Sequence, residues 1–266
     1  MKTLLLICLG AVRGVASSSG HDNGLHGLPL IKTSSGFVQG HAALNRSSVV
    51  EYLGIKYAHP ANGSLRFAPP EAYKSNTVIE ASSLSPDCPA NIAPVVNYPP
   101  LTAPDSSVLQ KFLFQNNKHM QSEDCLSLNI WTKSPGRVKK SRAVLLFDHG
   151  GRFQIPGSNS PFYNGHYLAD EEDVVVVTFN KRESILGYPG ATPNLGLLDF
   201  RLVVEWVRDN IAHFGGDVHR ITIWGQSAGG VAVDTYAYAY AKHPVVAGII
   251  ADSGLAFNRT PTYPAE

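Results

Sequence analysis

The sequence has few charged residues and almost no excess of either sign. Of its 266 residues, 16% are Asp, Glu, Lys or Arg, and the formal net charge is +1. This balance gives no electrostatic reason to expect nucleic acid, an acidic membrane surface or a polyanion as partner. Hydrophobic residues make up 44%, which is enough for one large core and too many for a disordered chain.

The start of the sequence lacks a hydrophobic run long enough to cross a membrane. Apolar residues fill positions 4–12, far fewer than the roughly 20 that a bilayer requires. Lys2 precedes the run and Ala16-Ser17-Ser18 follows it, which is the layout of a cleaved signal peptide; a short buried helix or a membrane anchor is the alternative. We expect residues 1–18 to be a signal peptide, residues 19–266 to form one domain, and the protein to be secreted without stable membrane insertion.

Cysteine is also scarce. Cys8 lies in the expected signal peptide, so the mature chain keeps only Cys88 and Cys125. An even pair in an oxidising compartment favours a disulfide, worth roughly 4 kcal/mol in the chain-entropy model. A catalytic thiol is the weaker alternative, because neither cysteine precedes a helix at a turn.

Three Asn-x-Ser/Thr sequons agree with secretion. They begin at Asn45, Asn62 and Asn258, each in a polar stretch rich in turn residues. Such short patterns also arise by chance, so they support glycosylation only together with the signal peptide.

The pattern of apolar residues predicts one α/β domain without repeats or an internal linker. Residues 31–40 and 49–57 alternate as short antiparallel strands do, and the proline-rich stretch 58–122 is expected to form loops. Alanine-rich or amphipathic segments predict helices at 198–211 and 228–241. Buried strands of a mostly parallel sheet are expected at 126–131, 143–147, 174–179, 221–224 and 246–251.

A Gly-x-Ser-x-Gly motif follows one of these strands and precedes a helix. It reads Gly225-Gln226-Ser227-Ala228-Gly229, and this context is typical of the strained turn that presents a nucleophilic serine. Gly225 and Gly229 leave room for the tight turn. A serine helix cap is the alternative, but it leaves both glycines unexplained.

A second glycine turn ends the strand expected at 143–147. There, Gly150 and Gly151 precede Arg152, and backbone N–H groups can gather. Such groups stabilise the oxyanion that forms when an acyl carbonyl is attacked. Gly151, Arg152 and Ala228 are the candidate donors, and an ordinary β-turn is the alternative.

These motifs resemble the type-B carboxylesterases, the family of fungal lipases, carboxylesterases and cholinesterases. The resemblance covers essentially the whole mature length, and residues 236–252 look most like fungal members. In family order, the matching segments are Gly54-Ile55-x-Tyr57-Ala58, Leu65-Arg66-Phe67-x-Pro69-Pro70, Glu123-Asp124-Cys125-Leu126-x-Leu128-Asn129, His149-Gly150-Gly151, Asn194-x-Gly196-Leu197-x-Asp199 and Phe214-Gly215-Gly216-Asp217.

The resemblance implies an α/β-hydrolase fold with helices on both faces of the sheet and with its C-terminal strands missing from this chain. It implies hydrolysis of a small-molecule or lipid ester, with Ser227 as nucleophile and with no metal or organic cofactor. It also implies that Cys88 and Cys125 form the first family disulfide. Glu123 and Arg182 would form a buried ion pair; two solvated surface charges are the alternative.

Three features of the chain depart from the family. Arg152 stands where a third glycine is usual, so a side chain restricts the turn and crowds the substrate gorge, and Lys181 stands where an aromatic residue is usual. The acid and the histidine that should follow Ser227 are absent. His243 is expected at the far end of the next helix, too distant to take the serine proton, and Asp252 has no histidine to orient.

Three interpretations therefore remain at the sequence level. The chain is part of a serine ester hydrolase, or an inactive relative that serves as an adhesion or binding module, or a fragment of a longer gene product. The intact motif around Ser227 counts against the inactive relative. The sequence leaves the preferred ester and the oligomeric state open.

Overall fold

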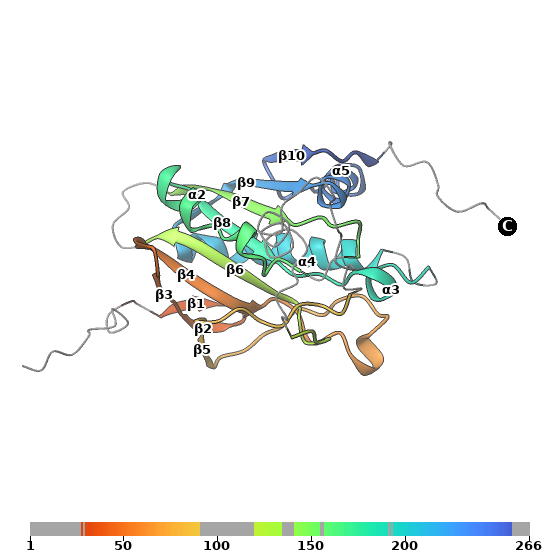
Figure 1. Ribbon diagram of the computed structural model, residues 1–266, viewed down its shortest axis with the longest axis horizontal. Coiled ribbons are helices and arrows are strands. Elements are labelled where there is room, and N and C mark those ends of the chain that lie inside the picture. The colour runs from red at the N-terminus through yellow and green to blue at the C-terminus, as the bar shows by residue number, and fades with distance from the viewer. Residues whose placement is uncertain are drawn as a thin grey trace, which may run out of the picture.

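A seven-stranded sheet forms the centre of the protein (Figure 1). The computed structural model describes residues 28, 30–90, 120–134, 141–154, 157–190, 192 and 194–256. The expected signal peptide and Asn258 lie outside the described residues. From one edge to the other, the strands are β10 (Gly248–Asp252), β9 (Gly216–Gln226), β7 (Arg142–Asp148), β8 (Val175–Phe179), β6 (Ser127–Lys133), β4 (Arg46–Lys56) and β3 (His41–Ala43).

The sheet is mixed, with a parallel half and an antiparallel half. Strands β10, β9, β7 and β8 run parallel, whereas β6, β4 and β3 pair antiparallel. The sequence predicts a mostly parallel sheet, and the strand expected at 126–131 is present but lies in the antiparallel half. Only residues 134–141 separate β6 from β7, and a parallel crossover needs a dozen residues or more.

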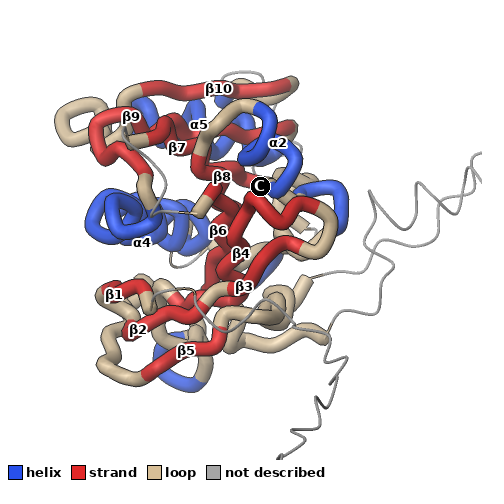
Figure 2. Tube along the Cα trace, turned by 90° about the vertical axis from the view of Figure 1, so that its left-hand side faces the viewer, coloured by secondary structure: helices blue, strands red, loops and turns tan. Residues whose placement is uncertain are grey.

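Helices cover both faces of this sheet, as expected (Figure 2). In β8, Val175 and Val177 belong to the core beneath α4 (Leu195–Asn210) and α5 (Ala228–Ala239). Val176 points to the other face, where it packs in a cluster with Ala169 of α2 (His166–Glu171). Because neighbouring side chains in a strand point to opposite faces, an unbroken apolar strand indicates that both faces are buried.

A second, three-stranded sheet lies beside the N-terminal half. It has the order β1 (Ile31–Thr33), β2 (Gly36–Gln39), β5 (Val78–Glu80), with β1 and β2 antiparallel as expected. Strand β5 was not predicted, since three residues are too few to show a period. The remaining short elements are η1 (Gly63–Leu65), η3 (Pro161–Tyr163), α3 (Ser184–Gly187) and η4 (Ile211–Phe214).

The disulfide between Cys88 and Cys125 is confirmed. Their Cα atoms lie 5.0 Å apart, and both residues are buried in the main core. Cys125 stands two residues before β6, so the bond joins the loop region after β5 directly to the central sheet.

The expected ion pair between Glu123 and Arg182 is wrong, because each residue has another partner. Glu123 pairs with Arg66 at the surface, where Nη2 donates to Oε2 over 2.7 Å. Arg182 is buried and binds Asp199 of α4 through Nε and Nη2, at 2.9 and 2.7 Å. Both arginines contact their carboxylate at two points, so each guanidinium is matched by a nearer partner than the one expected.

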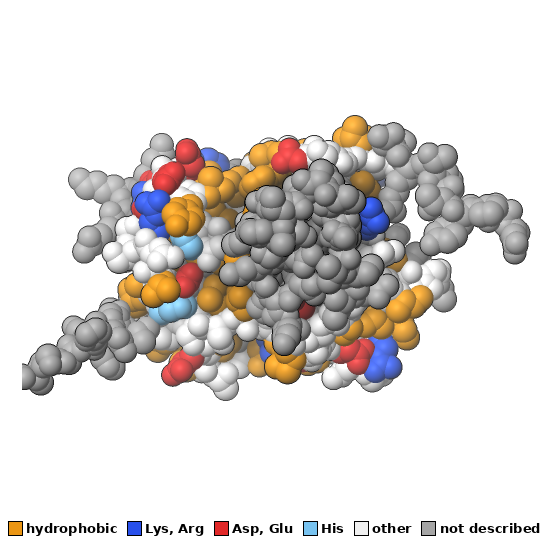
Figure 3. Space-filling model, viewed as in Figure 1, with side chains coloured by type: hydrophobic (Ala, Val, Ile, Leu, Met, Phe, Trp, Pro, Cys, Tyr) orange, Lys and Arg blue, Asp and Glu red, His pale blue; other side chains and the backbone are white. Residues whose placement is uncertain are grey.

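The surface of the described residues carries charges of both signs. On the face shown in Figure 3, basic and acidic side chains are interspersed among hydrophobic and neutral ones. Within the described ranges, no helix is long and apolar enough to span a membrane.

Candidate active site

Ser227 occupies the turn between β9 and α5. Its backbone angles are φ 57° and ψ −117°, a combination that is unfavourable for any residue with a side chain. The backbone oxygen of Asp252, at the end of the neighbouring strand β10, accepts a hydrogen bond from the Ser227 N–H over 2.7 Å. The strained conformation is therefore held by a hydrogen bond to the adjacent strand.

The glycines around Ser227 are required by close backbone contacts. A Cβ at Gly225 would lie 2.3 Å from the backbone carbonyl of Gly229, and one at Gly254 would lie 2.0 Å from the backbone carbonyl oxygen of Ser227. Neither distance is possible for a real side chain. The sequence motif predicted the first of these contacts, whereas Gly254 carries no local signal.

The second glycine turn lies directly against this one. Strands β7 and β9 are neighbours, and Asp148 is in register with Gly225. A Cβ at Gly150 would lie 2.0 Å from the backbone oxygen of Gln226, and one at Gly229 would lie 2.3 Å from the backbone oxygen of Asp148. The two motifs that the sequence analysis singled out thus meet at the carboxyl ends of neighbouring parallel strands, where α/β proteins commonly bind ligands.

The candidate donors have free N–H groups. Among the described residues, none accepts a hydrogen bond from the amide of Gly151 or Arg152. Ala228 is the first residue of α5, and the first N–H groups of a helix have no partner within it. The positive end of the helix dipole adds to the attraction that these groups exert on an anion.

The turn that carries two of these donors has an unusual backbone. Gly150, Gly151, Arg152 and Phe153 all have positive φ, at 72°, 91°, 59° and 59°. Glycine adopts such angles readily, but Arg152 and Phe153 do so at a cost. Arg152 can therefore occupy the position that resembles a third glycine, and its side chain is exposed rather than buried in the core.

No histidine in the described part of the chain forms a hydrogen bond with Ser227. His149 is buried, and burial together with the Lys181 charge lowers its pKa to about 3, so its imidazole is a poor acceptor for a serine proton. His243 lies beyond the end of α5, about 18 Å along the helix at 1.5 Å per residue. The Asp252 carboxylate accepts a hydrogen bond from the Trp224 indole over 2.5 Å.

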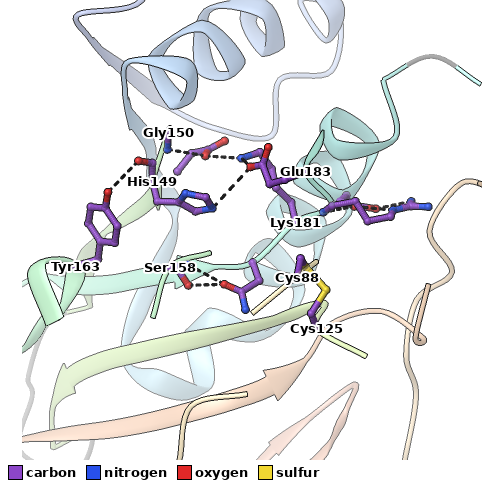
Figure 4. Close-up of polar contacts among 12 residues, drawn as sticks. Cys88, Cys125, His149, Gly150, Ser158, Tyr163, Lys181 and Glu183 are labelled. Atoms are coloured by element: carbon purple, nitrogen blue, oxygen red, sulfur yellow. Dashed lines mark hydrogen bonds and ion pairs between the residues drawn. A yellow bond between two sulfur atoms is a disulfide. The ribbon is translucent and has the colours of Figure 1, made fainter. Parts of the chain in front are cut away.

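A buried cluster of charged side chains lies beneath the glycine turn (Figure 4). Lys181 Nζ is 2.8 Å from Asp148 Oδ1 and 2.6 Å from Glu183 Oε1, and His149 Nε2 is 3.8 Å from the same Glu183 oxygen. All four residues are at most 1% exposed. In the sequence, Lys181 stands out as a departure from the family, but the cluster carries no signal, because its members come from the ends of two strands.

The pKa values of this cluster follow from burial and from the charges within it. Burial raises the pKa of Glu183 to about 8, with Lys181 opposing the rise and Asp148 adding to it. Burial alone would lower the pKa of Lys181, but the Asp148 and Glu183 carboxylates outweigh it and raise that pKa. Lys181 is therefore charged at neutral pH, while Glu183 exchanges its proton near pH 8.

Two of the predicted glycosylation sites lie on the surface. Asn45 is exposed in the turn between β3 and β4, and Asn62 is exposed before η1. Over the described ranges, no group of three or more His, Cys, Asp or Glu side chains is arranged to hold a metal ion.

Comparison with known proteins identifies the family. The profile of the carboxylesterase family matches residues 28–264. The chain belongs to the carboxylesterase family. This carboxylesterase chain is 36% identical to Secreted lipase 5 of Gibberella zeae, over 84% of its own length and 44% of the lipase. It is also 36% identical to chlorogenic acid esterase of Aspergillus niger, over 96% of its own length and 49% of that enzyme.

Solved carboxylesterase structures have the same fold. A thermophilic PNB esterase superposes with a TM-score of 0.69 at 31% identity, covering 85% of this chain and 44% of the esterase. The α/β-hydrolase fold is thereby confirmed. The chain spans less than half the length of these relatives.

Proposed function

We propose that this chain carries the nucleophile and the oxyanion-binding turn of a carboxylic ester hydrolase. The observation that supports this most directly is the contact between the Ser227 turn and the Gly150 turn, which brings a strained serine next to free N–H groups. Membership in the carboxylesterase family agrees with this chemistry.

In the proposed reaction, Ser227 Oγ attacks the carbonyl carbon of an ester. The carbonyl oxygen becomes negative and accepts hydrogen bonds from the N–H groups of Gly151, Arg152 and Ala228. The alcohol leaves with the proton of the serine, and water then releases the acid from the acyl-enzyme. The proposal places the base and the acid that orients it outside the described residues.

The substrate class follows from the family and from the relatives. A secreted lipase and a chlorogenic acid esterase point to a small-molecule or lipid ester. We propose that the protein acts outside the cell, since the disulfide, the exposed sequons at Asn45 and Asn62 and the sequence of residues 1–18 all agree with secretion.

Labelling with a fluorophosphonate probe tests the nucleophile, because the probe reacts with activated serines. We expect the purified protein to be labelled when the base that the proposal places outside the described residues is present, and Ser227→Ala to lose the label. Ser253→Ala is the matched control, since Ser253 lies in the adjacent turn after β10 and should be dispensable. Turnover of a short-chain p-nitrophenyl ester by the labelled chain would extend the proposal to hydrolysis.

Two results would count against the proposal. Equal labelling of Ser227→Ala and the parent would exclude Ser227 as the nucleophile. A correctly folded protein that contains this base and that neither labels nor hydrolyses ester would favour the alternative, a binding protein that keeps the fold without the chemistry.

A further inference from the structure

The turn from Asp148 to Phe153 requires support from the rest of the chain. It contains four consecutive residues with positive φ, and two of them are not glycine. Arg152 and Phe153 are strained in this conformation, and backbone strain persists only where the surrounding structure holds the residue in place. Two of the three donors proposed for the oxyanion, Gly151 and Arg152, lie within this turn, so whatever holds the turn also places them.

The segment Lys181–Ser184 contacts both ends of this turn. At the start, the Lys181 ammonium lies 2.8 Å from the Asp148 carboxylate, whose Oδ1 also accepts the Gly150 N–H over 3.4 Å. At the end, the Ser184 N–H donates to the Phe153 oxygen over 2.7 Å. Residues 181–184 therefore hold the turn at both of its ends.

Glu183 completes the attachment from below. Its Oε1 lies 2.6 Å from Lys181 Nζ, so a single ammonium bridges the Asp148 carboxylate and the Glu183 carboxyl group. Figure 4 shows Lys181 and Glu183 beside His149 and Gly150, with the Tyr163 hydroxyl bonded to the His149 oxygen. The site is closed to solvent, and an ion pair there is screened far less than one at the surface.

We propose that Lys181 is a positioning residue, which fixes the turn Asp148–Phe153 through its ion pair with Asp148 and so sets where the oxyanion donors lie. The inference rests on the proposed function for the role of those donors. The structural part of it concerns only the turn and can be tested without turnover.

The charge of the cluster changes near pH 8, where Glu183 loses its proton. The groups that face Glu183 are Lys181 and Asp148, with His149 from the turn and Asp199 from α4. Above this pH, two carboxylates share one ammonium without access to water, which is unfavourable. Because the folded pKa lies above the ordinary value of 4.5, the folded state loses stability as pH rises from about 4.5 to about 8.

Hydrogen exchange measured by mass spectrometry tests whether Lys181 holds the turn Asp148–Phe153 in place. The amides of Gln154 and Ser184 report on this turn, because they donate to the backbone oxygens of Gly151 and Phe153. In Lys181→Met, we expect both amides to exchange about tenfold faster, while strand β6 is unaffected. Lys56→Met is the matched control: it removes a half-exposed ion pair with Asp124 and should leave both amides unchanged.

A second variant guards against misfolding. Lys181→Met leaves Asp148 buried and unpaired, whereas Asp148→Asn/Lys181→Met removes both charges together. We expect the double variant to fold and to show the same local increase at Gln154 and Ser184. Exchange at parental rates in either folded variant, or an increase spread evenly over β6 and β9, would overturn the inference.

The pH profile gives a readout that a purely structural role would not move. In the parent, we expect exchange at Gln154, corrected for intrinsic rates, to rise as pH increases to about 8 and to level off above that pH. Glu183→Gln should remove this rise, because its amide does not ionise; a persisting rise would contradict the assignment. A parent chain that the probe does not label would count against the proposed function, while exchange at Gln154 and Ser184 still decides the role of Lys181.

Discussion

Arg152 shows how a single residue can occupy a site that suits glycine. Its φ of 59° is left-handed, its side chain is exposed, and no described residue forms a hydrogen bond or ion pair with it. The side chain therefore contributes strain without compensating contacts. A non-glycine residue in the left-handed conformation costs the folded state about 1 to 2 kcal/mol. Glycine removes this cost, but its greater freedom in the unfolded chain offsets part of the gain.

Arg152→Gly should consequently stabilise the protein. We expect the free energy of unfolding to rise by about 1 kcal/mol, measured by urea denaturation. Arg152→Lys keeps both the charge and the strain, so it should match the parent. A loss of stability in Arg152→Gly would show that the side chain makes a favourable contact.

At the scale of residues, the sequence predicts the structure where the signal is local. Gly225, Ser227 and Gly229 lie within five residues, and the turn between strand and helix requires them in that order. The partner of Arg182 could not be predicted in the same way, because Asp199 comes 17 residues later and only the packing of α4 brings it close. The cluster of Asp148, Lys181 and Glu183 was missed for the same reason.

At the scale of elements, Arg182 joins the end of β8 to α4 and to the N-terminal loops. Beyond Asp199, its Nη1 donates to the oxygens of Leu65, Arg66 and Ala68, at 3.4, 3.2 and 2.8 Å. One buried side chain thus satisfies three carbonyl groups of a loop that has little regular structure. The Arg182 guanidinium thus takes the place of a neighbouring strand in holding these three residues.

Asp199→Asn should therefore be strongly destabilising. Removing one charge of a buried pair leaves the other uncompensated, and we expect a loss of about 3 to 5 kcal/mol in the free energy of unfolding. Glu123→Gln breaks the exposed pair with Arg66 and is the matched control, with a much smaller loss. Equal losses would mean that Arg182 is as well solvated as Arg66.

The elements themselves were predicted best where a period is long enough to read. The helices α4 and α5 and the apolar strands β7, β8 and β9 show clear patterns over many residues. The antiparallel direction of β6 could not be predicted, since the short apolar run at 126–131 carries no information about the strands beside it. Direction depends on the length of the following connection, which is a property of the chain between elements.

For the whole molecule, the Cys88–Cys125 bond closes a long covalent loop of the chain. The two cysteines are separated by 37 residues. Cross-linking such a loop restricts the unfolded chain far more than the folded one, by about 4 kcal/mol in the chain-entropy model. The bond therefore acts on the stability of the entire domain.

Cys88→Ala/Cys125→Ala should unfold at lower urea concentration, with a loss of about 4 kcal/mol in the free energy of unfolding. Adding a reductant to the unfolded parent before refolding should reproduce this loss and should leave the double variant unchanged. An unchanged midpoint in the double variant would show that native contacts alone hold residues 88 and 125 together.

The order of strands in the central sheet also bears on how the chain assembles during synthesis. Strand β8 lies between β6 and β7, although both precede it in the sequence. The edges of β6 and β7 that β8 joins therefore stay unpaired until Phe179 has left the ribosome. Unpaired edges are open to association with other chains, so chaperones that recognise extended apolar segments have their longest opportunity during this interval.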